Sequence, residues 1–178
     1  LQYTLNYPNA EVKEAFITHL FESFTKNRLD EIQPAAEELL DYLMAEDIEG
    51  FMNIIRAMFA KIPYQLHIPL EAYYHSLFYM ILTLMGAETA LEVVTDKGRI
   101  DGILPFDDKV YIIEFKYGKP GTDMEKLTEK AVRQIREKKY EERFLNHPRK
   151  RILIGVGFVE KEIGYKIVAG DEQGYDAH

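Results

Sequence analysis

Cysteine is absent from the 178-residue sequence, and serine occurs only at Ser23 and Ser76. The lack of cysteine excludes disulfides, thiolate chemistry and cysteine-ligated zinc, and it is compatible with the cytoplasmic location that we expect. The scarcity of serine and the lack of a G-x-S-x-G motif argue against a serine hydrolase. Neither G-x-x-x-x-G-K-S/T nor G-x-G-x-x-G occurs, so a nucleotide-binding loop is missing from this chain. The five histidines show no H-E-x-x-H spacing, so that zinc-binding motif is missing too.

Long apolar runs are also missing. The longest candidate, residues 77–85, is about half of the roughly 18 residues that a membrane span needs. The N-terminus shows neither a basic region nor an apolar stretch of the kind found in signal peptides, so no membrane partner is expected. The chain begins at Leu1 rather than at a methionine, and we therefore expect it to be part of a longer polypeptide.

The length fits one globular domain, or one domain with a helical appendage. Apolar residues make up 47% and charged residues 29%, which is enough apolar surface to form a core and excludes wholesale disorder. The net charge is −8, but residues 1–60 hold 11 acids and 4 bases whereas residues 126–151 hold 10 bases and 4 acids. The overall charge argues against tight non-specific binding of nucleic acid, whereas the local basic stretch could still contact phosphate.

The first half of the sequence has a helical apolar period. It predicts four helices, delimited by residues that cap or break helices: Asn9 before a helix to about Phe24, Pro34 in the first turn of the second, Asp47 capping a third that ends by Pro63, and Pro69 opening a fourth that runs to Gly86.

The period then changes to two, which is typical of strands. Strands are expected over residues 91–95, 99–104 and 110–117, followed by a helix over 124–145 with Leu127, Ala131, Ile135 and Lys138 inward, a buried strand over 152–159 and an edge strand over 165–168. This order predicts an α/β fold in which helices flank a central sheet. The expected parts are a helical segment over 1–66, a core over 67–170 and a tail over 171–178.

The strand over residues 110–117 carries two charged residues in an otherwise apolar run. Glu114 and Lys116 are two apart and so share one face of the strand. If the hairpin turns at residues 107–108, opposite residues have numbers that sum to 215, and Asp101 then lies opposite Glu114. Their Cβ atoms would be about 4.5–5.5 Å apart.

Two facing carboxylates repel each other, and a divalent cation between them would remove that cost. Oxygen ligands of this kind suit Mg²⁺ or Mn²⁺. Lys116 beside such an ion could orient or deprotonate a water, or offset charge in a transition state. The alternative is an exposed strand face on which Glu114 and Lys116 form surface ion pairs.

Two helices offer further candidates. Glu71 and His75 lie one turn apart, so Glu71 could add a metal-binding carboxylate, while His75 is either an outer partner or a packed side chain. Gln134, near Lys130 and Arg133, could anchor the water or Lys116; its alternative is a solvated helix face.

The basic stretch interleaves cations with aromatic residues. Lys138, Lys139 and Tyr140 could contact a nucleic-acid backbone and stack on a base, or they could simply keep the surface soluble.

Together these motifs resemble the PD-(D/E)xK nuclease superfamily. The resemblance rests on a helix Glu71, the strand Gly98-Arg-Ile-Asp101-Gly, the strand Ile113-Glu114-Phe-Lys116 and a helix Gln134-Ile. It implies a restriction-endonuclease-like αβββαβ core. The chain looks most like a family of uncharacterised proteins in which this domain follows an AAA-ATPase-like domain, and residues 5–12 resemble the joint between the two domains.

The resemblance also implies roles. Asp101 and Glu114 match the metal-binding carboxylates, Lys116 the lysine that assists the attacking water, and Glu71 the helix acid of many members. Gln134 matches the glutamine of a Q-x-x-x-Y pattern, but Lys138 stands four residues further on and Tyr140 two beyond that.

These inferences predict a Mg²⁺- or Mn²⁺-dependent phosphodiesterase that acts on DNA or, as a second choice, RNA, with Lys130, Arg133, Lys138 and Tyr140 contacting the nucleic acid. The rival hypothesis is an inactive module that binds nucleic acid or protein through the same fold. A third hypothesis takes residues 1–65 as a packing surface or a homodimer interface.

Overall fold

The computed structural model describes residues 11, 19, 29–62, 71–85, 90–95, 98–140 and 150–170. The chain forms two compact units: Leu1–His67 with Ser76–Ala87, and Ile68–His75 with Glu88–His178. Most of the helix expected over 9–24, together with Pro63, Pro69, Gly86, the joint over 5–12 and the tail over 171–178, lies outside the described residues. Among those described, no helix is both long and apolar enough to cross a membrane.

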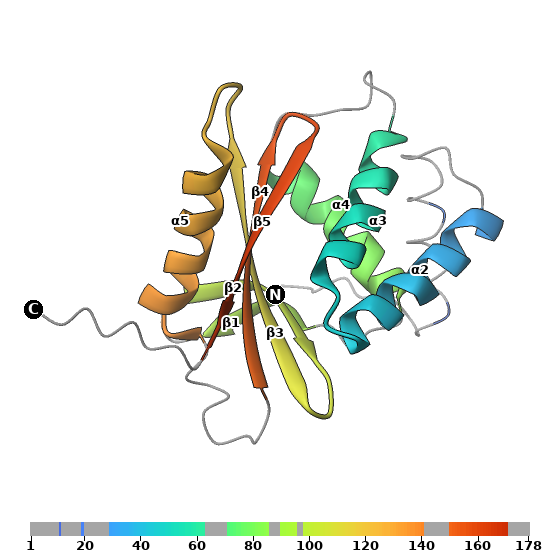
Figure 1. The fold of residues 1–178 in the computed structure, drawn as a ribbon, viewed down its shortest axis with the longest axis horizontal. Helices are drawn as coiled ribbons and strands as arrows, with labels where there is room; N and C mark the ends of the chain where they lie inside the picture. Colours follow the sequence, from blue (N-terminus) through green and yellow to red (C-terminus); the bar gives the residue numbers. More distant parts are fainter. Residues whose placement is uncertain are drawn as a thin grey trace, which may run out of the picture. The chain divides into compact units, whose positions relative to one another are not determined.

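The first unit is helical. It contains α2 (Leu29–Met44), α3 (Ile48–Ala60) and the later part of α4 (Glu71–Leu84), as Figure 1 shows. Asp47 caps α3 as expected, because its Oδ1 accepts a hydrogen bond from the Gly50 N–H at 2.8 Å. The expected start of the second helix was wrong: α2 begins at Leu29, so Pro34 lies inside the helix and α2 forgoes one backbone hydrogen bond there.

The second unit is built on a five-stranded mixed sheet with the order β1-β2-β3-β4-β5. Only the β3–β4 pairing is parallel, and α5 (Met124–Glu137) forms the crossover between those two strands (Figure 1). The α4-β1-β2-β3-α5-β4 order confirms the predicted αβββαβ core and the α/β class. The strands are β1 (Ala90–Thr95), β2 (Gly98–Pro105), β3 (Lys109–Gly118), β4 (Lys150–Val159) and β5 (Glu162–Ala169).

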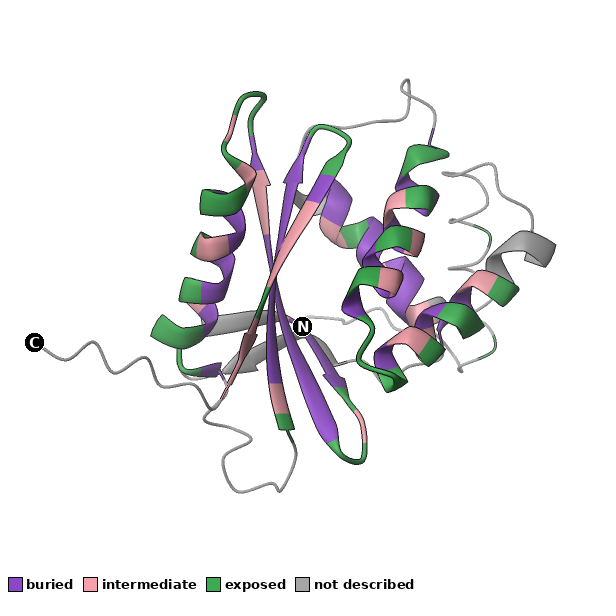
Figure 2. Ribbon diagram, viewed as in Figure 1, coloured by how far each residue is buried: buried purple, intermediate pink, exposed green. Residues whose placement is uncertain are grey.

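The register of the β2–β3 hairpin is as predicted. Gly102 pairs with Ile113, and Pro105 pairs with Val110, so the paired numbers sum to 215. Every residue of β4 from 152 to 159 is buried, as expected of a strand covered on both faces (Figure 2). β5 lies at the edge of the sheet, also as expected.

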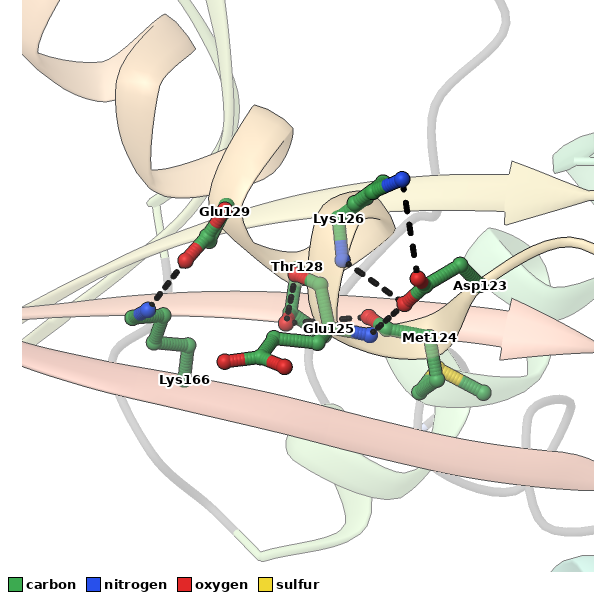
Figure 3. Close-up of polar contacts among 7 residues, drawn as sticks. All are labelled: Asp123, Met124, Glu125, Lys126, Thr128, Glu129 and Lys166. Atoms are coloured by element: carbon green, nitrogen blue, oxygen red, sulfur yellow. Dashed lines mark hydrogen bonds and ion pairs between the residues drawn. The ribbon is translucent and has the colours of Figure 1, made fainter.

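The helix α5 packs on one face of the sheet. Its N-cap is Asp123, whose Oδ1 accepts from the backbone N–H groups of Glu125 and Lys126 (Figure 3). It buries an apolar stripe over β4 formed by Leu127, Ala131, Val132 and Ile135 together with Thr128.

The helix α5 ends at Glu137, so its expected extension to residue 145 was wrong. Lys138 is the C-cap residue and is exposed rather than inward-facing. Lys139 adopts a left-handed backbone conformation with φ 53°, which ends the helical path and leads to the buried Tyr140. Residues 141–149 lie outside the described part of the chain.

Glycines beneath α5 let the helix lie close to the sheet. A Cβ added at Gly155 would collide with the Thr128 carbonyl oxygen and lie 2.9 Å from the Ala131 Cβ. A Cβ at Gly157 would lie 2.8 Å from the Met124 Sδ. This close approach sets how far side chains of α5 reach toward β3.

Candidate active site

Two adjacent strands bring three charged side chains together. Glu114 and Lys116 lie on the face of β3 that α5 covers, since their register partners on β4 are Gly155 and Gly157. Phe115 points to the opposite face, where its ring packs edge-on against His75 with the centroids 5.4 Å apart. His75 is therefore a packed side chain, one of the two expected readings.

Asp101 is fixed by the backbone of β3. Its Oδ2 accepts a hydrogen bond from the Phe115 N–H at 2.8 Å, beyond the last ladder pair of β2 and β3, Gly102 with Ile113. The carboxylate thus takes a strand N–H as its partner and lies next to Glu114. The spacing argument foresaw this neighbourhood, although not the bond to the backbone.

The two carboxylate oxygens of Glu114 have different surroundings. Oε1 accepts hydrogen bonds from Lys116 Nζ at 2.7 Å and from Gln134 Nε2. Lys116 Nζ also donates to the Phe115 carbonyl at 2.9 Å. Oε2 is buried and accepts no hydrogen bond within the described part of the chain.

This environment disfavours a charged Glu114. Only 1% of the residue is exposed. Burial, then the negative charge of Asp101 and a hydrogen bond that the protonated carboxyl makes to Asp101, raise the pKa of Glu114 to about 7, whereas Lys116 lowers it. A buried acceptor without a donor, beside a second carboxylate, is a place where a cation would be stabilised.

Comparison with known proteins assigns the chain to a family. Residues 70–166 match the family model described as PD-(D/E)XK nuclease superfamily. The chain belongs to this superfamily. Membership indicates a phosphodiester-hydrolysing domain that binds nucleic acid, and PD-(D/E)XK nucleases typically use divalent metal ions.

One relative is a protein of Azotobacter chroococcum mcd 1 called "Uncharacterized protein in vnfD 5'region". It is 30% identical over 164 residues, which cover 88% of this chain and 30% of the relative. The chain thus spans less than a third of the length of that relative. No solved structure matches the chain.

The residues of this PD-(D/E)XK domain fit a hard divalent cation. Asp101 and Glu114 offer neighbouring oxygen ligands, and no described side chain or backbone group donates to Glu114 Oε2. No group of three His, Asp or Glu residues gathers among the described side chains. Glu71 is the first residue of α4, and its side chain lies outside that set. Mg²⁺ commonly takes one or two carboxylates and completes its shell with water and phosphate, so two ligands are compatible with it.

Gln134 and Tyr140 both belong to the site, but in different ways from those expected. Gln134 bonds Glu114 directly rather than a solvated surface. Tyr140 is only 2% exposed and its hydroxyl hydrogen-bonds the Gln134 side chain. Its predicted stacking on a base was therefore wrong, because the ring is enclosed by the core.

The basic candidates on α5 remain on the surface. Lys130, Arg133 and Lys138 are all exposed. Sequence reasoning missed the role of Gly155 and Gly157, although two glycines two apart in a buried strand are a signal for close backbone approach on one face.

Proposed function

We propose that the chain is the nuclease domain of a larger protein and hydrolyses phosphodiester bonds of DNA, with RNA as the second-choice substrate. The observation that carries the proposal is the Oε2 of Glu114, which is buried beside the carboxylate of Asp101 and accepts no hydrogen bond from the described residues. A surface ion pair would leave no such atom. The match to the nuclease superfamily supports the same reading.

Asp101 and Glu114, with Glu71 in support, would hold Mg²⁺ or Mn²⁺. The bound ion would polarise the phosphate and acidify a water molecule. Lys116 has three N–H donors, of which Glu114 and the Phe115 carbonyl take two. The third can orient the attacking water or stabilise charge on the phosphate, and attack in line with the leaving oxygen needs such positioning.

The nucleic acid would reach the site along α5. Lys130 lies one helical turn before Gln134 and shares its side of the helix. Lys130, Arg133 and Lys138 are exposed, so their charges are available to phosphates.

The match covers only 30% of the length of the relative, which supports the proposal that this chain is part of a larger protein. We place an AAA-ATPase-like domain before the present chain, and we keep a homodimer formed through the helical segment as an alternative arrangement.

The decisive experiment is thermal unfolding of wild type and Asp101→Asn with and without Mn²⁺. A ligand that binds only the folded state stabilises it by RT ln(1 + [L]/Kd), so wild type should gain several degrees and the variant little. An inactive binding module would show no shift in either protein. Wild type that shows the shift is then assayed on single-stranded DNA, duplex DNA and RNA, and absence of cleavage on all three would contradict the nuclease proposal.

A further inference from the structure

Tyr140 is a polar side chain enclosed by the core next to the site. It lies three residues beyond the last residue of α5, Glu137, and only 2% of it is exposed. It belongs to a buried cluster with Ile103, Val110, Ile112, Ile135 and Leu153. The strand residues of this cluster come from β2, β3 and β4 and Ile135 comes from α5, so the ring belongs to a cluster built by three strands and the helix.

The chain reaches this position by leaving the helical path. In a continuing helix, residue 140 would lie about 240° around the axis from Gln134. Instead the Lys138 N–H bonds the Gln134 carbonyl at 3.0 Å, and Lys139 takes its left-handed conformation. This turn carries the Tyr140 ring back toward the side of α5 on which Gln134 lies.

The hydroxyl of Tyr140 joins the hydrogen bonds of the site. It bonds the side chain of Gln134, whose Nε2 also donates to Glu114 Oε1. Glu114 and Asp101 are near enough for their charges to raise the pKa of Tyr140, although burial is the larger cause. Gln134 therefore links the Tyr140 hydroxyl and the Glu114 carboxylate.

We infer that Tyr140 is a positioning residue that holds the Gln134 side chain where its Nε2 reaches Glu114. The acceptor carboxylate of Glu114 selects the N–H side of the amide, and the Tyr140 hydroxyl fixes where that amide lies. With Gln134 and Lys116 fixed on Oε1, Oε2 remains the oxygen presented beside Asp101. The inference rests on the proposed function, because fixing the Glu114 carboxylate in this way matters only if Glu114 binds a cation.

The test removes only the hydroxyl, in Tyr140→Phe, and Mn²⁺ is the probe in titration calorimetry. We expect the Kd for Mn²⁺ to rise about threefold to tenfold. Removing a group that orients a metal ligand directly typically costs about 10-fold to 100-fold in affinity, and Tyr140 acts one residue further away. In a Gln134→Leu background the same substitution should change the Kd no further, because its route of action is gone. Tyr111→Phe removes another buried hydroxyl and should leave the Kd unchanged. A merely structural role would lower the melting temperature of Tyr140→Phe without changing the Kd, and that result would overturn the inference.

A second readout does not depend on metal. In the metal-free protein, the two side-chain amide protons of Gln134 should give well-separated NMR signals that move toward free-glutamine positions in Tyr140→Phe. Unchanged signals would contradict the inference. If wild type takes up no Mn²⁺, the proposed metal site fails, and the amide signals still decide whether Tyr140 positions Gln134.

Discussion

Gly155 of β4 is the register partner of Glu114 of β3, and the missing side chain at Gly155 leaves room for α5 above the site. In Gly155→Ala the new methyl group would meet the Thr128 carbonyl oxygen and lie 2.9 Å from the Ala131 Cβ. The backbone of α5 would have to move, so we expect a loss of about 1–3 kcal/mol in the free energy of unfolding. Urea denaturation measures it, and Mn²⁺ affinity should fall as Gln134 is displaced.

Gly121→Asn is a matched control for this change. Gly121 has φ 83° and no atom within 4 Å of an added Cβ, and asparagine tolerates left-handed backbone better than most residues. Only the strain of a side chain at positive φ opposes it, so its unfolding free energy should fall less than that of Gly155→Ala. Equal stability of both variants would show that α5 does not lie close to Gly155.

The raised pKa of Glu114 makes the stability of the metal-free protein depend on pH. The unfolded chain should release this proton near the ordinary value of 4.5, whereas the folded protein holds it up to about pH 7. Between these values the folded state binds more protons, so stability falls as the pH rises. Urea denaturation in EDTA at several pH values should show wild type losing stability relative to Glu114→Gln across this window. Parallel curves for the two proteins would contradict a buried, proton-binding Glu114.

The arrangement of Asp101, Glu114 and Lys116 could be predicted because it depends on local rules. A strand puts residues two apart on one face, and a short hairpin turn at residues 107–108 fixes which residues lie opposite. The hydrogen bond from the Phe115 N–H to Asp101 could not be predicted, because it requires that the ladder between β2 and β3 begin only at Gly102 and leave Asp101 without a ladder pair on β3.

The end of α5 depends on tertiary packing instead. Residues 138–140 carry no glycine or proline, so the sequence alone favours a longer helix. Burying Tyr140 against Ile135 and Leu153 offsets the cost of a left-handed Lys139. Helix propensity depends on the local sequence, so it does not include the stabilisation gained by burying Tyr140 against distant residues.

Lys116 separates catalysis from cation binding. In Lys116→Ala the carboxylates of Asp101 and Glu114 both remain, so Mn²⁺ should still bind to the variant. Turnover should fall by about 100-fold or more, because a donor aimed at developing charge is lost. Calorimetry and a cleavage assay on one preparation measure both quantities. Lys166→Ala, on β5, is the control; wild-type turnover in Lys116→Ala would contradict the proposed mechanism.

The two flanks of α5 differ in what they face, and this predicts the path of the nucleic acid. Glu129 forms an ion pair with Lys166 of β5 at 2.7 Å (Figure 3), whereas Gln134 bonds Glu114 of β3. Lys130 shares the flank of Gln134 by its spacing of four, and Arg136, two residues after Gln134, lies on the flank toward β5.

Charge reversal on the two flanks should therefore have unequal effects on binding. In the Lys116→Ala background, fluorescence anisotropy with a DNA oligonucleotide follows binding without turnover. Lys130→Glu should weaken binding and reduce the slope of log K against log salt by about one, since one phosphate contact is lost. Arg136→Glu makes the same change in net charge and should reduce affinity much less. Equal losses in the two variants would mean that only net charge matters and that the strand does not follow the Gln134 flank.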